Sequence, residues 1–237
     1  MKKVHLPNVD STNEYLKRNY KSLENYTFVS CDNQTAGRGR YNRIWKSENG
    51  KNLLFSLLIL DSELINHFKE ISIIFAYSII KELENLGLND LSIKWPNDIY
   101  YKDKKLCGIL LESVSTNTID CLIAGVGLNV NQVKYYDDYI HEPISIKNIL
   151  NKDIPLDDLK DNIYSSLLNS LDDIKKGESY YQRISRYDYL KDKVVYADID
   201  DEKKLVKVIG INEDFSLKIA YNDKLYDKET GEISFHV

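Results

Sequence analysis

The stretch GRGRYNRIW, residues 37–45, combines three arginines with two glycines in a chain whose formal net charge is −5. Glycine lets the backbone approach a ligand closely. Each guanidinium presents a planar set of donors that suits a phosphate or a carboxylate. The stretch therefore predicts a flexible loop that closes over an anion. On these residues alone, an RGG-like nucleic-acid-binding segment and a merely solvated loop remain open.

A second group of polar residues lies in KWPNDIYYKDKKLCGILLE, residues 94–112, which contains Lys94, Asn97, Asp98 and Lys105. Taken alone, Asn97 and Asp98 are typical of a solvated hairpin turn. Lys105, however, directly precedes the apolar run LCGILL, so its ammonium is expected where a strand emerges from the core. A lysine in that place can neutralise a carboxylate and a phosphate as they react.

Two further stretches are candidates for ligand contacts. GVGLNVN, residues 125–131, has glycines at 125 and 127 but no third glycine and no helix after it, which excludes a Rossmann fingerprint. Glycines inside a strand instead let a ligand or another backbone lie close. STN, residues 11–13, opens a helix, where it can cap the helix and also hydrogen-bond a neutral polar ligand group.

Composition limits the class of protein. The chain has 237 residues, 43% of them hydrophobic and 29% charged, as in an ordinary globular protein. With 32 basic and 37 acidic residues it has no excess of positive charge, which argues against general nucleic-acid binding. We expect neither a membrane span nor a signal peptide. Cys31, Cys107 and Cys121 lack metal-ligand spacing and are expected to be buried thiols in a reducing cytoplasm.

The elements that must position these residues follow from hydrophobic periodicity and turn signals. Ser11 is expected as the N-cap of the first helix, with Glu14 completing a capping box. Long helices are predicted at 63–87, ending on Gly87, and at 157–176, ending on Gly177, with a shorter helical piece at 180–190. The predicted strands are 26–32, 52–60 (buried on both faces), 91–95, 98–101, 105–113, 118–130, 193–199, 204–211, 215–221 and 231–237.

This order predicts an α+β fold, in which a mixed sheet has helices on one side and is followed by a small C-terminal β-barrel. We place the larger domain at residues 1–185 and the barrel at residues 186–237.

Taken together and in this order, the motifs closely resemble those of the biotin protein ligases, over essentially the whole chain. They are Ser11-Thr12-Asn13, QTAGRGRYNRIW, KWPND, KKLCGILLE and GVGLNVN, with GEISF near the end resembling the small SH3-like domain of that family. The resemblance implies a class II synthetase-like catalytic domain followed by an SH3-like domain. Because the first motif begins at Ser11, we expect the short form, without an N-terminal DNA-binding domain.

The resemblance also implies roles for individual residues. Lys105 and Arg40 match the catalytic positions, whereas Lys104 does not. The implied biotin site consists of Ser11, Thr12, Asn13, Gln34, Arg38, Gly39, Arg40, Lys105, Gly125 and Gly127. The implied ATP and adenylate site consists of Arg38, Arg40, Arg43, Trp45, Asn97, Asp98 and Asn129. Residues 132–142 would form a second loop closing on the nucleotide, and Asn42 stands where the family usually has glycine.

The implied activity is the activation of biotin with ATP and Mg²⁺ to biotinyl-5′-AMP, followed by transfer to a lysine of a biotin carboxyl carrier domain. Asp98 is expected near the phosphates, but no set of metal ligands can be assigned. Two alternatives remain: a lipoate or octanoate ligase or transferase of the same fold, and a catalytically silent biotin-binding protein. The sequence leaves the carboxylase that supplies the acceptor undetermined, and both a homodimer and a monomer remain open.

Overall fold

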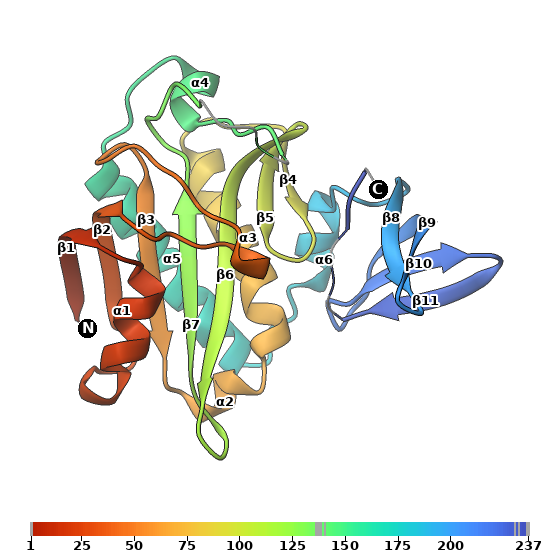
Figure 1. Cartoon of the computed structure of the whole chain (residues 1–237), viewed down its shortest axis with the longest axis horizontal. Coiled ribbons are helices and arrows are strands. Elements are labelled where there is room, and N and C mark those ends of the chain that lie inside the picture. Colours follow the sequence, from red (N-terminus) through yellow and green to blue (C-terminus); the bar gives the residue numbers. More distant parts are fainter. Residues whose placement is uncertain (1, 136–138, 140, 230, 232, 236–237) are drawn as a thin grey trace.

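The computed structural model describes residues 2–135, 139, 141–229, 231 and 233–235. Its larger part is a seven-stranded sheet in the order β1-β2-β3-β7-β6-β5-β4 (Figure 1). β1 and β2 are parallel, and every other neighbouring pair is antiparallel, so the expected mixed sheet is confirmed. The strands are β1 (Lys3–Val9), β2 (Phe28–Gln34), β3 (Leu53–Ile59), β4 (Leu91–Lys94), β5 (Asp98–Tyr101), β6 (Lys104–Ser115) and β7 (Ile119–Leu128).

Helices cover both faces of this sheet, so the expectation of helices on one side is wrong. α3 (Phe68–Asn85) and α5 (Leu156–Lys175) pack together behind the sheet in the view of Figure 1, whereas α1 (Thr12–Asn19) lies in front of it. The central strand β3 is buried along its whole length, as its continuous apolar run predicted. Leu58 of β3 packs with Leu16 of α1, while Leu57 joins the large core formed with α3 and α5.

Several local predictions need correction. The helix predicted at 63–87 is two helices, α2 (Ser62–Ile65) and α3, although Gly87 follows the second with a φ of +92°, as its C-terminal position required. Ser11 is the N-cap of α1, but its side chain makes no cap hydrogen bond, and Glu14 instead accepts from Lys17 at 2.9 Å. The predicted capping box is therefore absent.

β1 and α4 (Ile146–Leu150) were not predicted from the sequence. β1 is an edge strand with alternating burial and a proline, so it carries little of the apolar signal on which strand prediction depends. α4 is only five residues long. Its N-cap is Ser145, whose hydroxyl accepts from the backbone N–H of Asn148. The helical piece expected at 180–190 is confirmed in part as α6 (Tyr181–Ile184) and a following 3-10 turn, Ser185–Tyr187.

The C-terminal part is a second, four-stranded antiparallel sheet in the order β11-β10-β9-β8 (Figure 1). Its strands are β8 (Val194–Ile199), β9 (Glu202–Ile211), β10 (Leu217–Tyr221) and β11 (Lys224–Lys228). The fourth strand was expected at 231–237, but it lies at 224–228. In the described residues of the final segment, Ser234 forms a bridge with Tyr196 of β8. The second sheet fits the SH3-like expectation, while the boundary between residues 185 and 186 stays a prediction.

A buried hydrogen bond joins the two sheets. Trp95, directly after β4, donates its indole N–H to the backbone carbonyl of Phe215 at 2.8 Å. Asp188, between the sheets in sequence, accepts from the backbone N–H groups of Leu190 and Ile211. Burial raises the pKa of the Asp188 carboxyl. In the described part of the chain, no helix is long and apolar enough to cross a membrane.

Candidate functional site

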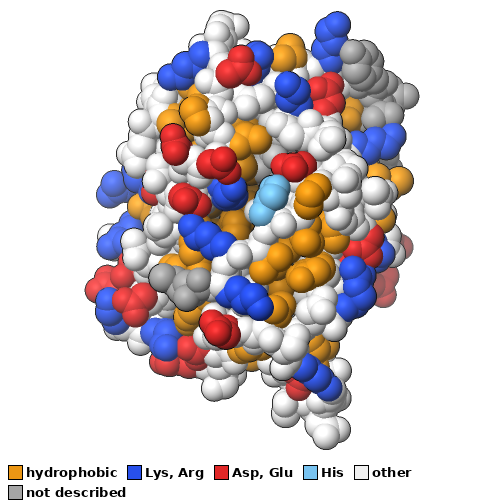
Figure 2. Space-filling model, turned by 90° about the vertical axis from the view of Figure 1, so that its left-hand side faces the viewer, with side chains coloured by type: hydrophobic (Ala, Val, Ile, Leu, Met, Phe, Trp, Pro, Cys, Tyr) orange, Lys and Arg blue, Asp and Glu red, His pale blue; other side chains and the backbone are white. Residues whose placement is uncertain are grey.

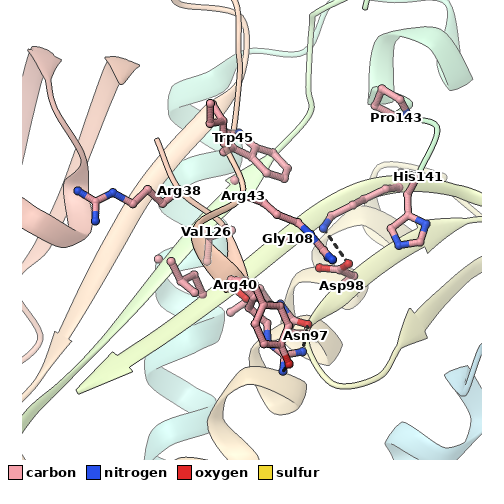
Figure 3. A pocket seen from close by; sticks show the side chains of 18 of the residues that line it. Arg38, Arg40, Arg43, Trp45, Asn97, Asp98, Gly108, Val126, His141 and Pro143 are labelled. Atoms are coloured by element: carbon pink, nitrogen blue, oxygen red, sulfur yellow. Dashed lines mark hydrogen bonds and ion pairs between the residues drawn. The ribbon is translucent and has the colours of Figure 1, made fainter. Parts of the chain in front are cut away.

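The motifs converge on one cavity of about 410 Å³ above the carboxyl half of β7 and the start of β6 (Figure 3). Every site residue predicted from the sequence lines it, although these residues are up to 118 positions apart. Their roles remain predictions. They are Ser11, Thr12, Asn13, Gln34, Arg38, Gly39, Arg40, Arg43, Trp45, Asn97, Asp98, Lys105, Gly125, Gly127 and Asn129.

The basic loop is folded as a small hairpin. Arg38 and Ile44 form a bridge, and the backbone N–H of Gly39 donates to the carbonyl of Arg43 at 2.7 Å. Tyr41 and Asn42, at its tip, both have a positive φ, at 55° and 57°. Asparagine adopts this left-handed conformation more readily than most residues, which explains how Asn42 can stand in place of glycine.

The three arginines of the hairpin point in different directions. Arg43 extends toward Asp98, whereas Arg38 extends away from it, toward β1 and β2 (Figure 3). Arg40 donates to Asn97 Oδ1 at 3.4 Å and to the carbonyl of Gly231 at 3.1 Å. The hairpin is thereby tied to the turn after β4 and to the chain that follows β11.

Lys105 is held in the cavity by a carboxylate and an aromatic ring. Its Nζ donates to Asp98 Oδ2 at 2.7 Å and lies 5.7 Å from the centre of the Trp45 ring. Its backbone N–H donates to the carbonyl of Glu142 at 2.8 Å, which fixes the start of β6. Lys104 points the other way and pairs with the exposed Glu142 side chain. The structure thus places Lys105, and not Lys104, among the cavity residues.

Two glycines of β7 make room for side chains that the sequence analysis did not connect with them. A Cβ at Gly125 would lie 2.2 Å from Asn13 Oδ1, and a Cβ at Gly127 would lie 2.5 Å from Cε2 of Trp45. The close approach expected at these glycines is therefore made by Asn13 and Trp45 of the protein itself. Trp45 Nε1 is buried and has no hydrogen-bond partner among the described residues.

The deep end of the cavity is neutral and polar. The Thr12 backbone N–H donates to Gln34 Oε1 at 2.8 Å. Ser56 Oγ lies 2.7 Å from Thr12 Oγ1 and 2.5 Å from Asn13 Oδ1. Ser56 was missed because it lies inside the apolar strand β3, where a single hydroxyl gives no motif.

Another part of the cavity wall holds a cluster that the motifs did not assign. Lys94 Nζ lies 2.9 Å from His141 Nε2, and both side chains line the cavity. Burial, with the positive charges of Lys94 and Lys105, lowers the pKa of His141 to about 4, so the imidazole is neutral at pH 7. His141 belongs to the expected second loop at 132–142, of which residues 136–138 and 140 lie outside the described residues.

The remaining predicted residue, Asn129, holds the backbone of the site. Its N–H donates to the carbonyl of Leu106 at 3.0 Å, and its side chain lies 3.5 Å from the carbonyl of Lys105. The described residues contain no group of three or more His, Cys, Asp or Glu side chains that is placed to hold a metal ion. Asp98 is the one acidic side chain among the described lining residues, and its Oδ1 is buried without a partner there.

Positive charge is in excess in the lining of the cavity, where Asp98 is the one acidic side chain among the described residues. Over the face shown in Figure 2, lysines and arginines are interspersed with acidic side chains, among the residues that it describes. The basic residues that line the cavity are Arg38, Arg40, Arg43, Lys46, Lys94 and Lys105. Such an arrangement can bind a small polyanion at one end and, at the Thr12 and Asn13 end, a neutral polar group.

Comparison with known proteins relates the chain to one family of ligases. Residues 6–129 match the model of the Biotin/lipoate A/B protein ligase family. The chain is 35% identical over 124 residues to the bifunctional ligase/repressor BirA of Bacillus spizizenii, which is 52% of this chain and 37% of that protein. It is 31% identical over 138 residues to BirA of Escherichia coli, 58% of this chain and 43% of that protein. The chain thus matches less than half the length of these relatives.

Similarity to solved structures extends further along the chain. The biotin protein ligase of Aquifex aeolicus in complex with biotin and ATP superposes with a TM-score of 0.87 and 28% identity, covering 98% of this chain and 97% of that one. The biotin protein ligase of Leishmania major in complex with biotinyl-5-AMP superposes with a TM-score of 0.65 at 23% identity, covering 95% and 98%, and it supports the fold alone.

Proposed function

Because the chain belongs to the biotin/lipoate A/B protein ligase family, we propose that it uses ATP to attach biotin to a lysine of a biotin carboxyl carrier domain. In the first step a carboxylate oxygen of biotin attacks the α-phosphorus of ATP. The bond to the β-phosphate oxygen breaks, and pyrophosphate leaves. In the second step the lysine amine of the acceptor attacks the carbonyl carbon of biotinyl-5′-AMP, and AMP leaves.

The observation that carries this proposal is the position of the Lys105 ammonium. It lies in a cavity that also contains Arg40 and Arg43, next to the half-buried indole of Trp45. The first step brings two anions together, which fixed positive charge in a partly desolvated site stabilises. The relationship to the Aquifex aeolicus ligase, bound to biotin and ATP and similar over nearly its full length, supports the same interpretation.

In the proposal, the neutral polar end of the cavity binds the ring system of biotin, at the opposite end of that substrate from its carboxylate. Biotin carries a cyclic urea, which has two N–H donors and one carbonyl acceptor. Thr12, Asn13 and Gln34 offer a hydroxyl and two amides to such a group. In this proposal the urea lies against these residues, the valeryl chain follows β7 past Gly125 and Gly127, and the carboxylate reaches Lys105.

The cavity also fits a magnesium ion that arrives with ATP. Mg²⁺ keeps several waters and is held by one or two carboxylates together with substrate phosphates. Asp98 provides a buried carboxylate oxygen, Oδ1, without a partner in the described residues, while its Oδ2 holds Lys105. Asp98 would therefore hold the ion, which would screen the phosphate charges.

The hairpin at 37–45 has a second role in the proposal. A mixed anhydride hydrolyses readily, so the intermediate must be shielded until the acceptor arrives. Arg40 ties the hairpin to Asn97 and to Gly231, which also line the cavity. We propose that these contacts keep the hairpin closed over the adenylate.

The test is an incubation of the protein with ATP, Mg²⁺, an isolated biotin carboxyl carrier domain and radiolabelled biotin. A parallel reaction contains labelled lipoate and a lipoyl carrier domain instead. Label from biotin on the carrier, and none on a carrier whose acceptor lysine is replaced by arginine, supports the proposal. Label from lipoate on a lipoyl carrier domain, without label from biotin, replaces the proposal with a lipoate ligase. Biotin binding without pyrophosphate release would mean a silent binding protein.

A further inference from the structure

Asn13, at the deep end of the cavity, has its side-chain amide held in one orientation. Nδ2 donates to Glu112 Oε2 at 2.7 Å and is 3.3 Å from the carbonyl of Leu110. Oδ1 lies 2.5 Å from Ser56 Oγ and points over Gly125, where a Cβ would be 2.2 Å away. An amide nitrogen has two N–H donors, and here both face acceptors.

The reverse orientation of the amide is disfavoured by the same neighbours. A flipped amide would bring Oδ1, an acceptor, against the Glu112 carboxylate and the Leu110 carbonyl, which are acceptors too. Asn13 is only 4% exposed, so water cannot relieve that repulsion cheaply. Asn13 therefore presents its oxygen, and not its nitrogen, to the cavity.

Glu112 lies outside the cavity and reaches it through Asn13. It is on β6 and is absent from the lining, whereas Asn13 and Leu110 line it. Lys17 of α1 donates to Glu112 Oε1 at 2.7 Å, which leaves Oε2 for Asn13. Lys17 also donates to Glu14 Oε1 at 2.9 Å. The ion pair with Lys17 holds the carboxylate in the orientation that receives the Asn13 N–H.

We propose that Glu112 is a positioning residue for substrate selection, because it fixes Asn13 as a hydrogen-bond acceptor for an N–H of the substrate. The inference rests on the proposed function, in which that N–H belongs to the urea of biotin. An amide oxygen has two lone pairs, and Ser56 occupies one of them. The other is left for the ligand. A ligand with an acceptor or a methyl group at that place would leave the second lone pair of Asn13 Oδ1 without a donor and is rejected.

The first experiment measures dissociation constants by calorimetry for biotin and for its two mono-N-methyl isomers. Each isomer lacks one urea N–H. For the wild type we expect one isomer to bind at least about tenfold more weakly than the other, since one buried hydrogen bond is lost and one is retained. In Glu112→Gln the amide of Asn13 is no longer fixed by a carboxylate. We expect the affinity for biotin to fall about tenfold, and the preference between the isomers to shrink.

The second experiment exchanges the donor and the acceptor of the hydrogen bond between Asn13 and Glu112. Asn13→Asp alone places two carboxylates together, so biotin affinity is expected to fall further than in Glu112→Gln. In the double variant Asn13→Asp, Glu112→Gln, the introduced glutamine amide can donate to the introduced carboxylate, whose other oxygen still faces the cavity. Part of the lost affinity and the isomer preference should therefore return, as a double-mutant cycle reveals. Glu14→Gln changes a residue that pairs with Lys17 and with Arg38 but makes no side-chain hydrogen bond to Asn13. It is therefore the matched control for the isomer preference, which it should keep.

Circular dichroism of each variant separates loss of folding from loss of binding, and the steady-state constants separate positioning from chemistry. We expect the KM for biotin to rise in Glu112→Gln while kcat and the KM for ATP stay within about twofold, as for a lost ground-state contact. An unchanged isomer preference in a folded Glu112→Gln variant, or no recovery in the double variant, would overturn the inference. Failure of the wild type to bind biotin would instead overturn the proposed function.

Discussion

Individual side chains in the cavity divide into those that carry charge and those that hold the charge in place. Lys105 illustrates both roles, because its ammonium is balanced by Asp98 Oδ2 at 2.7 Å and backed by the Trp45 ring. Its neighbour Lys104 is chemically identical but points to the exposed Glu142. A difference of one residue in a strand reverses the direction of the side chain, so the two lysines form a natural pair for comparison.

Replacing Lys105 by methionine is expected to reduce adenylate formation by about 10²-fold or more, because the aliphatic stem stays while the charge that offsets two meeting anions is lost. Pyrophosphate release in the presence of biotin and ATP measures this. Lys104→Met is the control and should retain nearly full activity. Normal turnover by Lys105→Met together with an inactive Lys104→Met would contradict the assignment.

The lowered pKa of His141 makes the free energy of unfolding depend on pH. Its folded pKa of about 4 lies below the ordinary value of 6.5, because of burial and of the charges on Lys94 and Lys105. Between these values the unfolded chain binds a proton that the folded protein does not. The contribution of the neutral His141 to the free energy of unfolding is therefore fully present above pH 6.5 and is lost as the pH falls toward 4.

For His141→Gln we expect a shallower fall in the free energy of unfolding between pH 6.5 and 4 than for the wild type, since glutamine does not titrate. Urea unfolding at a series of pH values measures the slope. Parallel curves for His141→Gln and the wild type would contradict this expectation.

The hairpin at 37–45 is the element whose closure matters most for the proposed chemistry. Its backbone is shaped by the Arg38–Ile44 bridge and by left-handed residues at its tip, and Arg40 supplies the contacts to the rest of the cavity mouth. In Arg40→Gly these contacts are lost, and glycine raises the entropic cost of ordering the hairpin.

Arg40→Gly is therefore expected to uncouple the two half-reactions: the adenylate forms, is bound more weakly, and escapes before an acceptor arrives. Released anhydride would acylate lysines of any protein nearby. The measurement is a blot for biotin on a bystander protein without an acceptor motif, after incubation with the variant, biotin and ATP. Bystander labelling equal to that of the wild type, with normal retention of the adenylate, would mean that the hairpin does not guard the intermediate.

For the whole molecule, the question is how the two sheets hold one cavity. Gly231, beyond the last strand of the second sheet, accepts from Arg40, and Trp95 of the first sheet's motif KWPND donates to the carbonyl of Phe215. The second sheet thus supports the hairpin on one side and the turn after β4 on the other.

Trp95→Phe removes the buried N–H that joins the sheets and leaves the Phe215 carbonyl without it. We expect a loss of about 1–3 kcal/mol in the free energy of unfolding, as for a buried acceptor that loses its partner. Urea unfolding followed by circular dichroism measures it. Tyr20→Phe, which removes a partly buried hydroxyl from Asp120 at the far end of β7, is the control with a smaller expected loss. A Trp95→Phe variant as stable as the wild type would show that this bond does not couple the sheets.

Local chemistry made much of the protein predictable from its sequence. The continuous apolar run of β3 predicted a strand buried on both faces, Gly87 and Gly177 marked helix ends, and the ordered motifs identified the lining of the cavity. Each of these signals is carried by neighbouring residues and is therefore visible in a short stretch of sequence. The resemblance to a known family connected motifs that no local rule could have joined.

Tertiary structure decided the features that depend on distant residues. The edge strand β1 forms because β2 supplies its partner, and the placement of α1 opposite α3 and α5 depends on which face of β3 each helix covers. The pairing of Lys94 with His141 and the orientation of Asn13 by Glu112 join residues 47 and 99 positions apart. A hydrogen bond is specified by the positions of both its partners in space, and a sequence gives only the identity of each.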